Sequence, residues 1–336
     1  MKIIDRLIQS AKENPGRVVL PEGSEPRILH AARRLLDEGI AKPVLLGDHD
    51  KIETEAKRIN VSLAGIDVRD TRATADPELM DLLELYRAER PGTRIEVARR
   101  LLRKPLFFGG MMVKKGDAEA MIAGTAHPTA RVIEAGLMTV GAEEGINTPS
   151  SFFLIVLPEF NGEKDKPLVY ADCGVVIEPD ASQLSDIAIA SSRSASLLLD
   201  ETPRVAFLSF STKGSAQHSR IEIVKDALQM TRERVPDLLA DGEFQVDSAL
   251  VPRVAATKVK EPSDVAGKAN VLIFPDLNSG NIAYKLTQYL AGAAAIGPIL
   301  QGFSRPVCDL SRGASVDDII AAAAIGIAQA RERRTV

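Results

Sequence analysis

Short apolar runs alternate with helical apolar patterns along almost the whole chain, and this alternation limits the possible folds. The run 17–22 (RVVLPE) resembles a strand, and the stretch 25–39 (EPRILHAARRLLDEG) after it has apolar residues three and four apart. The same order returns through the strand-like runs 42–48, 119–124, 151–158, 168–173, 204–210 and 270–277 and the helical patterns 51–59, 129–140 and 181–199. Apolar strands that alternate with helices predict a doubly wound α/β architecture with parallel strands.

The composition argues against several classes of protein. The 336 residues carry a formal net charge of −4, which gives no electrostatic reason to bind nucleic acid. No apolar run has the length of a membrane span, and residues 1–14 have the pattern of an amphipathic helix rather than of a signal peptide. The histidines, Cys173 and Cys308 lack metal-binding spacing. We therefore predict a cytoplasmic protein that has no nucleic-acid or membrane partner and no metal site.

A polar loop, Ser211-Thr212-Lys213-Gly214-Ser215, follows the strand-like run 204–210. Ligands of open α/β folds bind beyond the carboxyl ends of strands, so loops at this position are candidate sites. Backbone N–H groups, hydroxyls and a lysine ahead of a helix favour an anion, although the Walker A pattern is absent. The alternative is a solvated turn that caps the next helix.

Two further loops also follow strand-like runs. Asn278, Ser279, Gly280 and Asn281 lie between the run 270–277 and a helix that we expect to begin near Ile282. These residues can donate hydrogen bonds to a ligand, but they are also ordinary turn residues.

His127 follows the run 119–124, and Arg131 falls in the first turn of the next helical pattern. A single histidine is more often a structural hydrogen-bonding group than a catalyst.

The segment 308–320 (CDLSRGASVDDII) crowds charged and hydroxyl side chains into one loop. Ser315 with Asp318 three residues later predicts a capping box with Asp in place of Glu. Arg312 can hold a phosphate through two parallel hydrogen bonds, and a neighbouring carboxylate can accept a proton. Ser311 has no histidine close in sequence and would be a poor nucleophile, so we interpret it as a hydrogen-bond donor to a developing oxyanion.

Long sequence blocks resemble the phosphate acetyltransferases (phosphotransacetylases) of the phosphate acyltransferase family, from one end of the chain to the other. The blocks are VVLPEGSEPRIL, IAGTAHPTA, LSFSTKGSA, DGEFQVDSALVP, GKANVLIFPDLNSGNIAYK, GPILQGFSRPV and DLSRGASVDDI. The resemblance implies the reaction acetyl-CoA + phosphate ⇌ CoA + acetyl phosphate, with no permanently bound cofactor. It also implies a homodimer whose chains each form two doubly wound α/β domains around an interdomain cleft, as in isocitrate and isopropylmalate dehydrogenases. The polar stretch EEGINTPSS near 145–150 and the Gly/Pro-bearing stretch IGPILQG near 295–300 place these domains at 1–148 with 300–336 and at 149–299.

The resemblance also implies residue roles, position by position. CoA thiolate attacks acetyl phosphate directly in a ternary complex. Ser311 polarises the acyl carbonyl, Arg312 binds phosphate and Asp318 deprotonates the thiol. The candidates for holding substrate are Ser211, Thr212, Lys213, Gly214, Ser215, Asn278, Ser279, Asn281, His127, Arg131 and Arg90.

The chain departs from the family pattern where an arginine is common in the helix after His127. Glu134 stands at that place, and Arg131, one turn earlier, is the residue we expect to compensate. The segment LYRAERPGT also differs from the family, and Arg90 is its matching arginine. These changes leave propionyl or butyryl transfer open as an alternative to acetyl transfer. A weakly active acyl-CoA-binding regulatory protein is a further alternative.

Overall fold

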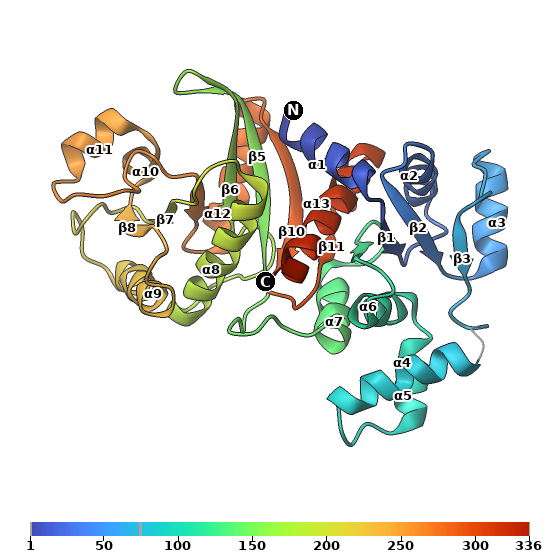
Figure 1. Ribbon diagram of the computed structural model, residues 1–336. Helices are drawn as coiled ribbons and strands as arrows, with labels where there is room; N and C mark the ends of the chain where they lie inside the picture. Colours follow the sequence, from blue (N-terminus) through green and yellow to red (C-terminus); the bar gives the residue numbers. More distant parts are fainter. Residues whose placement is uncertain (1, 74–75, 336) are drawn as a thin grey trace. The chain divides into compact units, whose positions relative to one another are not determined.

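The computed structural model describes residues 2–73 and 76–335, and its helices and strands form two compact α/β units (Figure 1). We call Ile4–Glu143 with the segment from Phe303 onward the N-terminal unit, and Glu144–Gly302 the central unit. The α/β class predicted from the sequence is confirmed. The domain limits at 148 and 300 stay a prediction. Within the two described ranges, no helix combines the length and the apolar character that crossing a bilayer requires.

The N-terminal unit is built on a parallel sheet with the strand order β11-β4-β1-β2-β3. Its strands are β1 (Gly16–Leu20), β2 (Ala41–Leu46), β3 (Asp67–Arg69), β4 (Ala120–Ala123) and β11 (Val307–Asp309). Its helices are α1 (Lys2–Glu13), α2 (Pro26–Asp37), α3 (His49–Arg58), α4 (Asp76–Glu89), α5 (Ile95–Leu102), α6 (Pro105–Lys115), α7 (Thr129–Thr139) and α13 (Val316–Thr335). The amphipathic helix predicted for residues 1–14 is therefore confirmed as α1. Helices α4, α5 and α6 were not predicted from the apolar pattern.

Helices cover both faces of this sheet. Helices α2 and α13 pack against each other and against the sheet, and α6 and α7 form a second packed pair (Figure 1). Small residues let α13 lie close to the sheet, since a Cβ atom at Gly326 would come within 2.7 Å of the Ala120 Cβ atom on β4. Four consecutive alanines precede this point, and all of them are buried. A helix without bulky side chains at this position fits directly against the strand.

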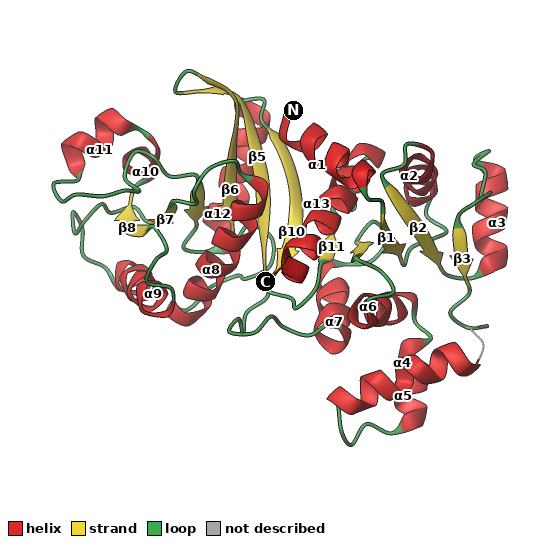
Figure 2. Ribbon diagram, viewed as in Figure 1, coloured by secondary structure: helices red, strands yellow, loops and turns green. Residues whose placement is uncertain are grey.

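The central unit has a mixed sheet with the order β10-β5-β6-β9-β7-β8 (Figure 2). Its strands are β5 (Ser150–Phe160), β6 (Glu163–Ala171), β7 (Val205–Leu208), β8 (Ala240–Phe244), β9 (Val271–Ile273) and β10 (Ala294–Gln301). Its helices are α8 (Ala181–Leu198), α9 (Ser219–Arg234), α10 (Val246–Leu250), α11 (Pro252–Lys258) and α12 (Leu277–Leu290). Strands β6, β9, β7 and β8 are parallel, whereas β5 is antiparallel to both of its neighbours.

The prediction of an all-parallel sheet is wrong for β5 and β6 because a tight hairpin joins them. Phe160 pairs with Glu163, which leaves only Asn161 and Gly162 in the turn. Both turn residues have positive φ, 51° and 82°. Asn-Gly favours this type of turn, whose twist matches that of the two strands. The dipeptide was a readable signal that the periodicity analysis did not use.

Helix α12 packs tightly against the face of the central sheet that carries Phe153 of β5. Phe153 stacks on Tyr284 of α12 with ring centroids 4.0 Å apart. The helix passes so close to the end of β6 that a Cβ atom at Gly280 would lie 2.3 Å from the backbone oxygen of Asp172. This oxygen belongs to the main chain and cannot rotate away, so only glycine fits at position 280.

We expect Gly280→Ala to destabilise the protein by about 1–3 kcal/mol, because overpacking outweighs the gain of about 1 kcal/mol that Ala normally brings to a helix. Urea unfolding of the variant and the wild type measures the difference. Asn278→Ala is the matched control, because it changes an exposed position in the first turn of the same helix. Equal or greater stability of Gly280→Ala would show that the helix does not approach the strand as described.

Candidate functional site

The order of strands in the N-terminal unit marks one place at the sheet edge where a ligand is expected. From β1 the chain proceeds to β2 and β3 on one side, and β4 and β11 lie on the other side of β1. The order therefore reverses between β1 and β4, and ligands of open α/β sheets bind at such a switch point beyond the carboxyl ends of the strands. The loops at this edge are 21–25, 124–128 and 310–315, and they lead into α2, α7 and α13.

A buried carboxylate, Glu22, joins the first two of these loops. Its two oxygens accept hydrogen bonds from the backbone N–H groups of Gly124, Thr125, Ala126 and His127 at 2.8–3.1 Å. The Thr125 hydroxyl and the Nδ1 atom of the His127 ring also bond to it, the latter at 2.8 Å. Burial favours the protonated form of Glu22, but these hydrogen bonds outweigh it and lower the pKa to about 2. The loop after β4 is thus wrapped around a permanent negative charge.

The His127 ring contacts Glu22 on one side and solvent on the other. Its side chain is 42% exposed, whereas that of Glu22 is 1% exposed. No hydrogen bond to the Nε2 atom is formed within residues 2–73 and 76–335. This ring therefore differs from a structural core histidine, in which both nitrogens are bonded within the protein.

A second buried carboxyl group, Asp309, lies at the end of β11. It is paired in register with Ala123 of β4, and its Oδ2 atom bonds to the Thr129 hydroxyl at 2.5 Å. The Oδ1 atom is buried without a hydrogen-bond partner among the described residues, beside Gly124. Burial and the nearby Glu22 charge raise the pKa of Asp309 to about 7, against the smaller opposing effect of the Thr129 hydrogen bond. Asp309 is not among the site residues predicted from the sequence.

Ser311 and Arg312 lie two and three residues after Asp309, and both are exposed. The Ser311 hydroxyl oxygen accepts a hydrogen bond of 3.2 Å from the Gly313 N–H group. The backbone oxygens of Arg312 and Ala314 each accept a bond of 2.8 Å from the guanidinium group of Arg27 on α2. The loop is therefore held by its main chain, and the Arg312 side chain makes no hydrogen bond to the part of the protein that the structure describes.

Sequence reasoning missed Arg27, because nothing in its local pattern shows that it reaches a loop 285 residues away. Its guanidinium group also bonds to Glu25 at 2.7 Å and approaches the Thr125 backbone oxygen at 3.5 Å. Arg27 thus links the loops that follow β1, β4 and β11.

Asp318 takes part in the predicted capping box at the start of α13. Its Oδ2 atom accepts bonds of 2.8 Å from both the N–H group and the hydroxyl of Ser315, and its own N–H group donates to the Ser315 hydroxyl oxygen at 3.2 Å. The neighbouring Asp317 points elsewhere and pairs with Arg34 at 2.7 Å. The cap is confirmed. A role for Asp318 in proton transfer stays a prediction.

Arg131 and Arg90 both lie on or beside α7, but they have other partners. Arg131 forms an ion pair of 2.6 Å with Glu134, three residues along the same helix. Arg90 donates to the backbone oxygens of Leu137 and Met138 at 2.7 and 3.0 Å. These oxygens belong to the last turn of α7, so Arg90 lies at the opposite end of the helix from His127. Arg90 neutralises the negative end of the helix dipole there.

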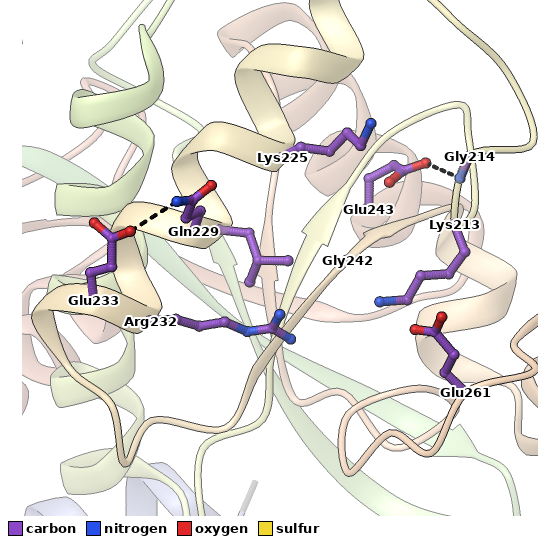
Figure 3. Close-up of a pocket in the computed structure, with 10 residues that line it drawn as sticks. Lys213, Gly214, Lys225, Gln229, Arg232, Glu233, Gly242, Glu243 and Glu261 are labelled. Atoms are coloured by element: carbon purple, nitrogen blue, oxygen red, sulfur yellow. Dashed lines mark hydrogen bonds between the residues drawn. The ribbon is translucent and has the colours of Figure 1, made fainter.

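In the central unit, the loop Ser211–Ser215 is already folded around an anion of the protein itself. The Oε1 atom of Glu243 accepts hydrogen bonds from the Ser211 hydroxyl at 2.8 Å and from the Gly214 N–H group at 2.7 Å. Figure 3 shows the bond between Glu243 and Gly214. Thr212 donates its N–H group to the Ser215 hydroxyl oxygen at 3.0 Å. The helix that follows this loop, α9, begins only at Ser219 with His218 as its N-cap, so the loop does not itself form the helix N-terminus.

Lys213 is also engaged within the unit. Its Nζ atom pairs with Asp241 at 2.6 Å, and Arg232 of α9 pairs with the same oxygen at 3.0 Å. The ends of the two basic side chains point toward each other in Figure 3, across a hollow of about 690 Å³. Glu243 and Glu261 line the same hollow. Its basic and acidic groups balance each other, so the hollow offers no clear preference for an anion.

The polar residues after β9 belong to a helix rather than to a loop. Helix α12 begins at Leu277, not near Ile282 as the sequence analysis expected. The reason is Asp276, whose side chain caps the helix by accepting the Ser279 N–H group at 2.8 Å. Asn281 donates to the Cys173 backbone oxygen at 3.1 Å, whereas Asn278 is exposed. This helix N-terminus is thus capped by a carboxylate of the protein.

Comparisons with known proteins agree on one family. The sequence profile described as "Phosphate acetyl/butaryl transferase" matches residues 2–327. The phosphate acetyltransferase of Acetivibrio thermocellus is 45% identical over 333 residues, which are 98% of this chain and 99% of that protein. The phosphate acetyltransferase of Bacillus subtilis is 40% identical over 315 residues, 94% of each chain.

Solved structures agree with these sequence matches. A phosphotransacetylase from Streptococcus pyogenes has a TM-score of 0.90 at 37% identity and covers 98% of both chains. A 4-hydroxythreonine-4-phosphate dehydrogenase from Burkholderia phymatum has a TM-score of 0.55 at 11% identity, with 94% of this chain and 98% of that chain covered. This second likeness concerns the fold alone. The family resemblance stated from the sequence is confirmed.

The raised pKa of Asp309 predicts how stability depends on pH. Because the folded state holds this proton up to about pH 7 and the unfolded state releases it near the ordinary aspartate pKa of 3.8, stability falls as pH rises between these values. Asp309→Asn mimics the protonated acid, so we expect the variant to lose less stability than the wild type between pH 5 and pH 8. The difference should be a few kcal/mol at most. Urea unfolding at both pH values measures it, and an unchanged pH dependence in the variant would contradict the assignment.

Proposed function

The chain belongs to the phosphate acetyl/butaryl transferase family, and from this premise we propose that it is a phosphate acetyltransferase that converts acetyl-CoA and phosphate into CoA and acetyl phosphate. The proposal rests on the arrangement of side chains at one edge of the N-terminal sheet. There, the exposed side chains of Ser311 and Arg312 lie beside the loop that Glu22 holds. CoA and acetyl-CoA are substrates in this proposal, and no cofactor stays bound between turnovers.

Arg312 is the group we propose for phosphate binding. Its guanidinium group makes no hydrogen bond within residues 2–73 and 76–335, while its backbone is fixed by Arg27. A planar guanidinium group matches two oxygens of a phosphate. The start of α7 supports binding of an anion at this edge, because its N-cap is Pro128, which makes no side-chain cap hydrogen bond.

Ser311 and Asp318 complete the proposed mechanism. The Ser311 hydroxyl donates a hydrogen bond to the acyl carbonyl oxygen, which gains negative charge as the thiolate attacks. The CoA thiol, with an ordinary pKa of about 8.5, is mostly protonated at neutral pH, so a base assists the reaction. Asp318 supplies that base through its Oδ1 atom, since Oδ2 is occupied by the cap. No covalent acyl-enzyme is needed.

We also propose that the protein is a cytoplasmic homodimer. Helix α12 exposes a stripe of apolar side chains one and two turns apart. Ile282 is 57% exposed, Leu286 52%, Tyr289 80% and Leu290 82%. A contiguous apolar stripe on a stable helix favours burial against a partner.

The proposed activity is tested by CoA-dependent release of phosphate from acetyl, propionyl and butyryl phosphate. We expect the highest kcat/KM with acetyl phosphate. A higher value with propionyl or butyryl phosphate would make the chain a transferase for longer acyl groups. Binding of acetyl-CoA without turnover of any of the three would instead support an acyl-CoA-binding regulatory protein.

Within the same assay, Asp318→Asn should lower kcat by roughly 10²–10⁴-fold, the usual effect of losing a general base. Part of the loss should return as the pH approaches the pKa of the thiol, because free thiolate then becomes available. Asp317→Asn is the matched control: it removes the same charge from the same helical turn but only breaks the pair with Arg34. Full turnover of Asp318→Asn at neutral pH would leave Asp318 as a helix cap only.

Light scattering coupled to size-exclusion chromatography tests the dimer. We expect the double variant Leu286→Glu/Leu290→Glu to be monomeric, because burying two carboxylates in an apolar contact is strongly unfavourable. Val97→Glu is the control, since Val97 is 48% exposed on α5 and lies outside the stripe. A wild-type monomer, or a double variant that is still dimeric, would contradict the assignment of this surface.

A further inference from the structure

The proposed reaction needs a proton donor as well as a base. When the sulfur of CoA attacks the acyl carbon and the C–O bond breaks, the bonding electron pair stays on the phosphate oxygen. The products are a thioester and phosphate, and the departing oxygen must gain a proton to give hydrogen phosphate. One proton is therefore lost from sulfur and one is gained by oxygen in each turnover. Asp318, as an ionised acceptor, accounts only for the first transfer.

We propose that His127 donates this second proton from its Nε2 atom to the departing phosphate oxygen, and that Glu22 is the positioning residue that orients the ring. The inference rests on the proposed function. In the reverse direction, the neutral ring takes the proton from hydrogen phosphate as its oxygen attacks the thioester. In that direction, protonated Asp318 gives its proton to the departing CoA thiolate. After the forward reaction, Asp318 instead releases the thiol proton to solvent and His127 regains a proton from solvent, so the enzyme returns to its starting state.

The contacts of Glu22 decide which nitrogen of the ring is available. Glu22 is ionised at neutral pH and can only accept hydrogen bonds. The Nδ1 atom lies 2.8 Å from its Oε1 atom, so Nδ1 must carry the proton of that bond. The neutral ring is then held as the Nδ1–H tautomer, with Nε2 free to accept a proton. When the ring is protonated, the pair becomes an ion pair and Nε2–H is a donor.

The contacts of Glu22 fix this orientation of the His127 ring. It is 1% exposed and bonds both to the ring and to the backbone N–H group of the same residue, His127, at 2.8 Å. Its other bonds hold residues 124–126, so neither the carboxylate nor the loop can rotate independently. If Glu22 only anchored the loop, its bonds to the backbone N–H groups would be sufficient, and a bond to the Nδ1 atom of the His127 ring would not be needed.

The loop proposed to hold phosphate leaves the sheet beside the loop that carries this ring, within the same unit. Asp309, two residues before Ser311, is paired in register with Ala123, four residues before His127. Arg27 bonds to the backbone oxygens of Arg312 and Ala314. Arg131, the basic residue in the first turn of α7, is engaged elsewhere because it pairs with Glu134. Asp309 lies near this site and interacts with the charges of Glu22 and Arg312.

Chemical rescue tests the proton transfer. We expect His127→Ala to lower kcat for CoA-dependent phosphate release by roughly 10²-fold or more. A series of substituted imidazoles should restore part of the rate, with a rescue that depends on the pKa of the added imidazole. If the added imidazole only filled the space left by the His127 ring, the restored rate would not depend on the pKa of the imidazole. The control is His49→Ala, which removes a histidine that faces Glu53 on the exposed helix α3.

Nitrogen-15 NMR of histidine-labelled wild-type protein tests the orientation independently of turnover. The His127 signals, identified by their loss in His127→Gln, should show a protonated Nδ1 and an unprotonated Nε2 in the neutral ring. Glu22→Gln should abolish this preference, and Glu53→Gln should leave it unchanged.

Full kcat of His127→Ala, or rescue that is absent or equal for all imidazoles, would overturn the proton-donor role while leaving the transferase function standing. An Nε2–H tautomer in the wild type would overturn the positioning role of Glu22. Failure of the wild type to transfer any acyl group would contradict the proposed function, and this inference with it.

Discussion

The hydrogen bonds of one buried carboxylate, Glu22, organise the candidate site. Burying a carboxylate is costly unless its oxygens are hydrogen-bonded. Here, four backbone N–H groups, a hydroxyl and a ring nitrogen bond to it. Each hydrogen bond to a charged group contributes about 1.5–3 kcal/mol, which explains why the ionised form persists although the side chain is 1% exposed. The loop after β4 therefore has its shape before any substrate arrives, which is what electrostatic catalysis requires.

Carboxylates of the central unit also accept hydrogen bonds from loops. There, they occupy the hydrogen-bond donors of loops that the sequence predicted as substrate-binding sites. Glu243 fills the loop Ser211–Ser215, and Asp276 caps α12. Asp172 also accepts the N–H groups of Gly174 and Val176 at 2.8 Å after β6, although burial raises the pKa of this side chain. Loops that have the composition of anion-binding loops thus bind carboxylates of their own chain. At the edge of the N-terminal sheet, by contrast, the guanidinium group of Arg312 is exposed and makes no hydrogen bond to a described residue.

The parts of the structure that depend on local sequence were predictable. Alternating apolar runs identified most strands and helices of the parallel core, and the spacing of Ser315 and Asp318 predicted the cap of α13. Contacts that depend on the fold were not predictable. Glu22 meets His127 105 residues away, and Arg27 meets Arg312 285 residues away. Asp309 looked like one acid among several, because its burial arises only when β11 joins β4. The Asn161-Gly162 hairpin was readable in the sequence but lay outside the periodicity that was used.

Amide hydrogen exchange of the wild type and of Glu22→Gln tests most directly whether the Glu22 carboxylate organises the loop. The account predicts that the N–H groups of Thr125, Ala126 and His127 are protected in the wild type and exchange much faster in the variant. The N–H groups of β4 (Ala120–Ala123) should keep their protection in both. Loop amides that exchange at unprotected rates in the wild type, or that keep their protection in Glu22→Gln, would contradict the account.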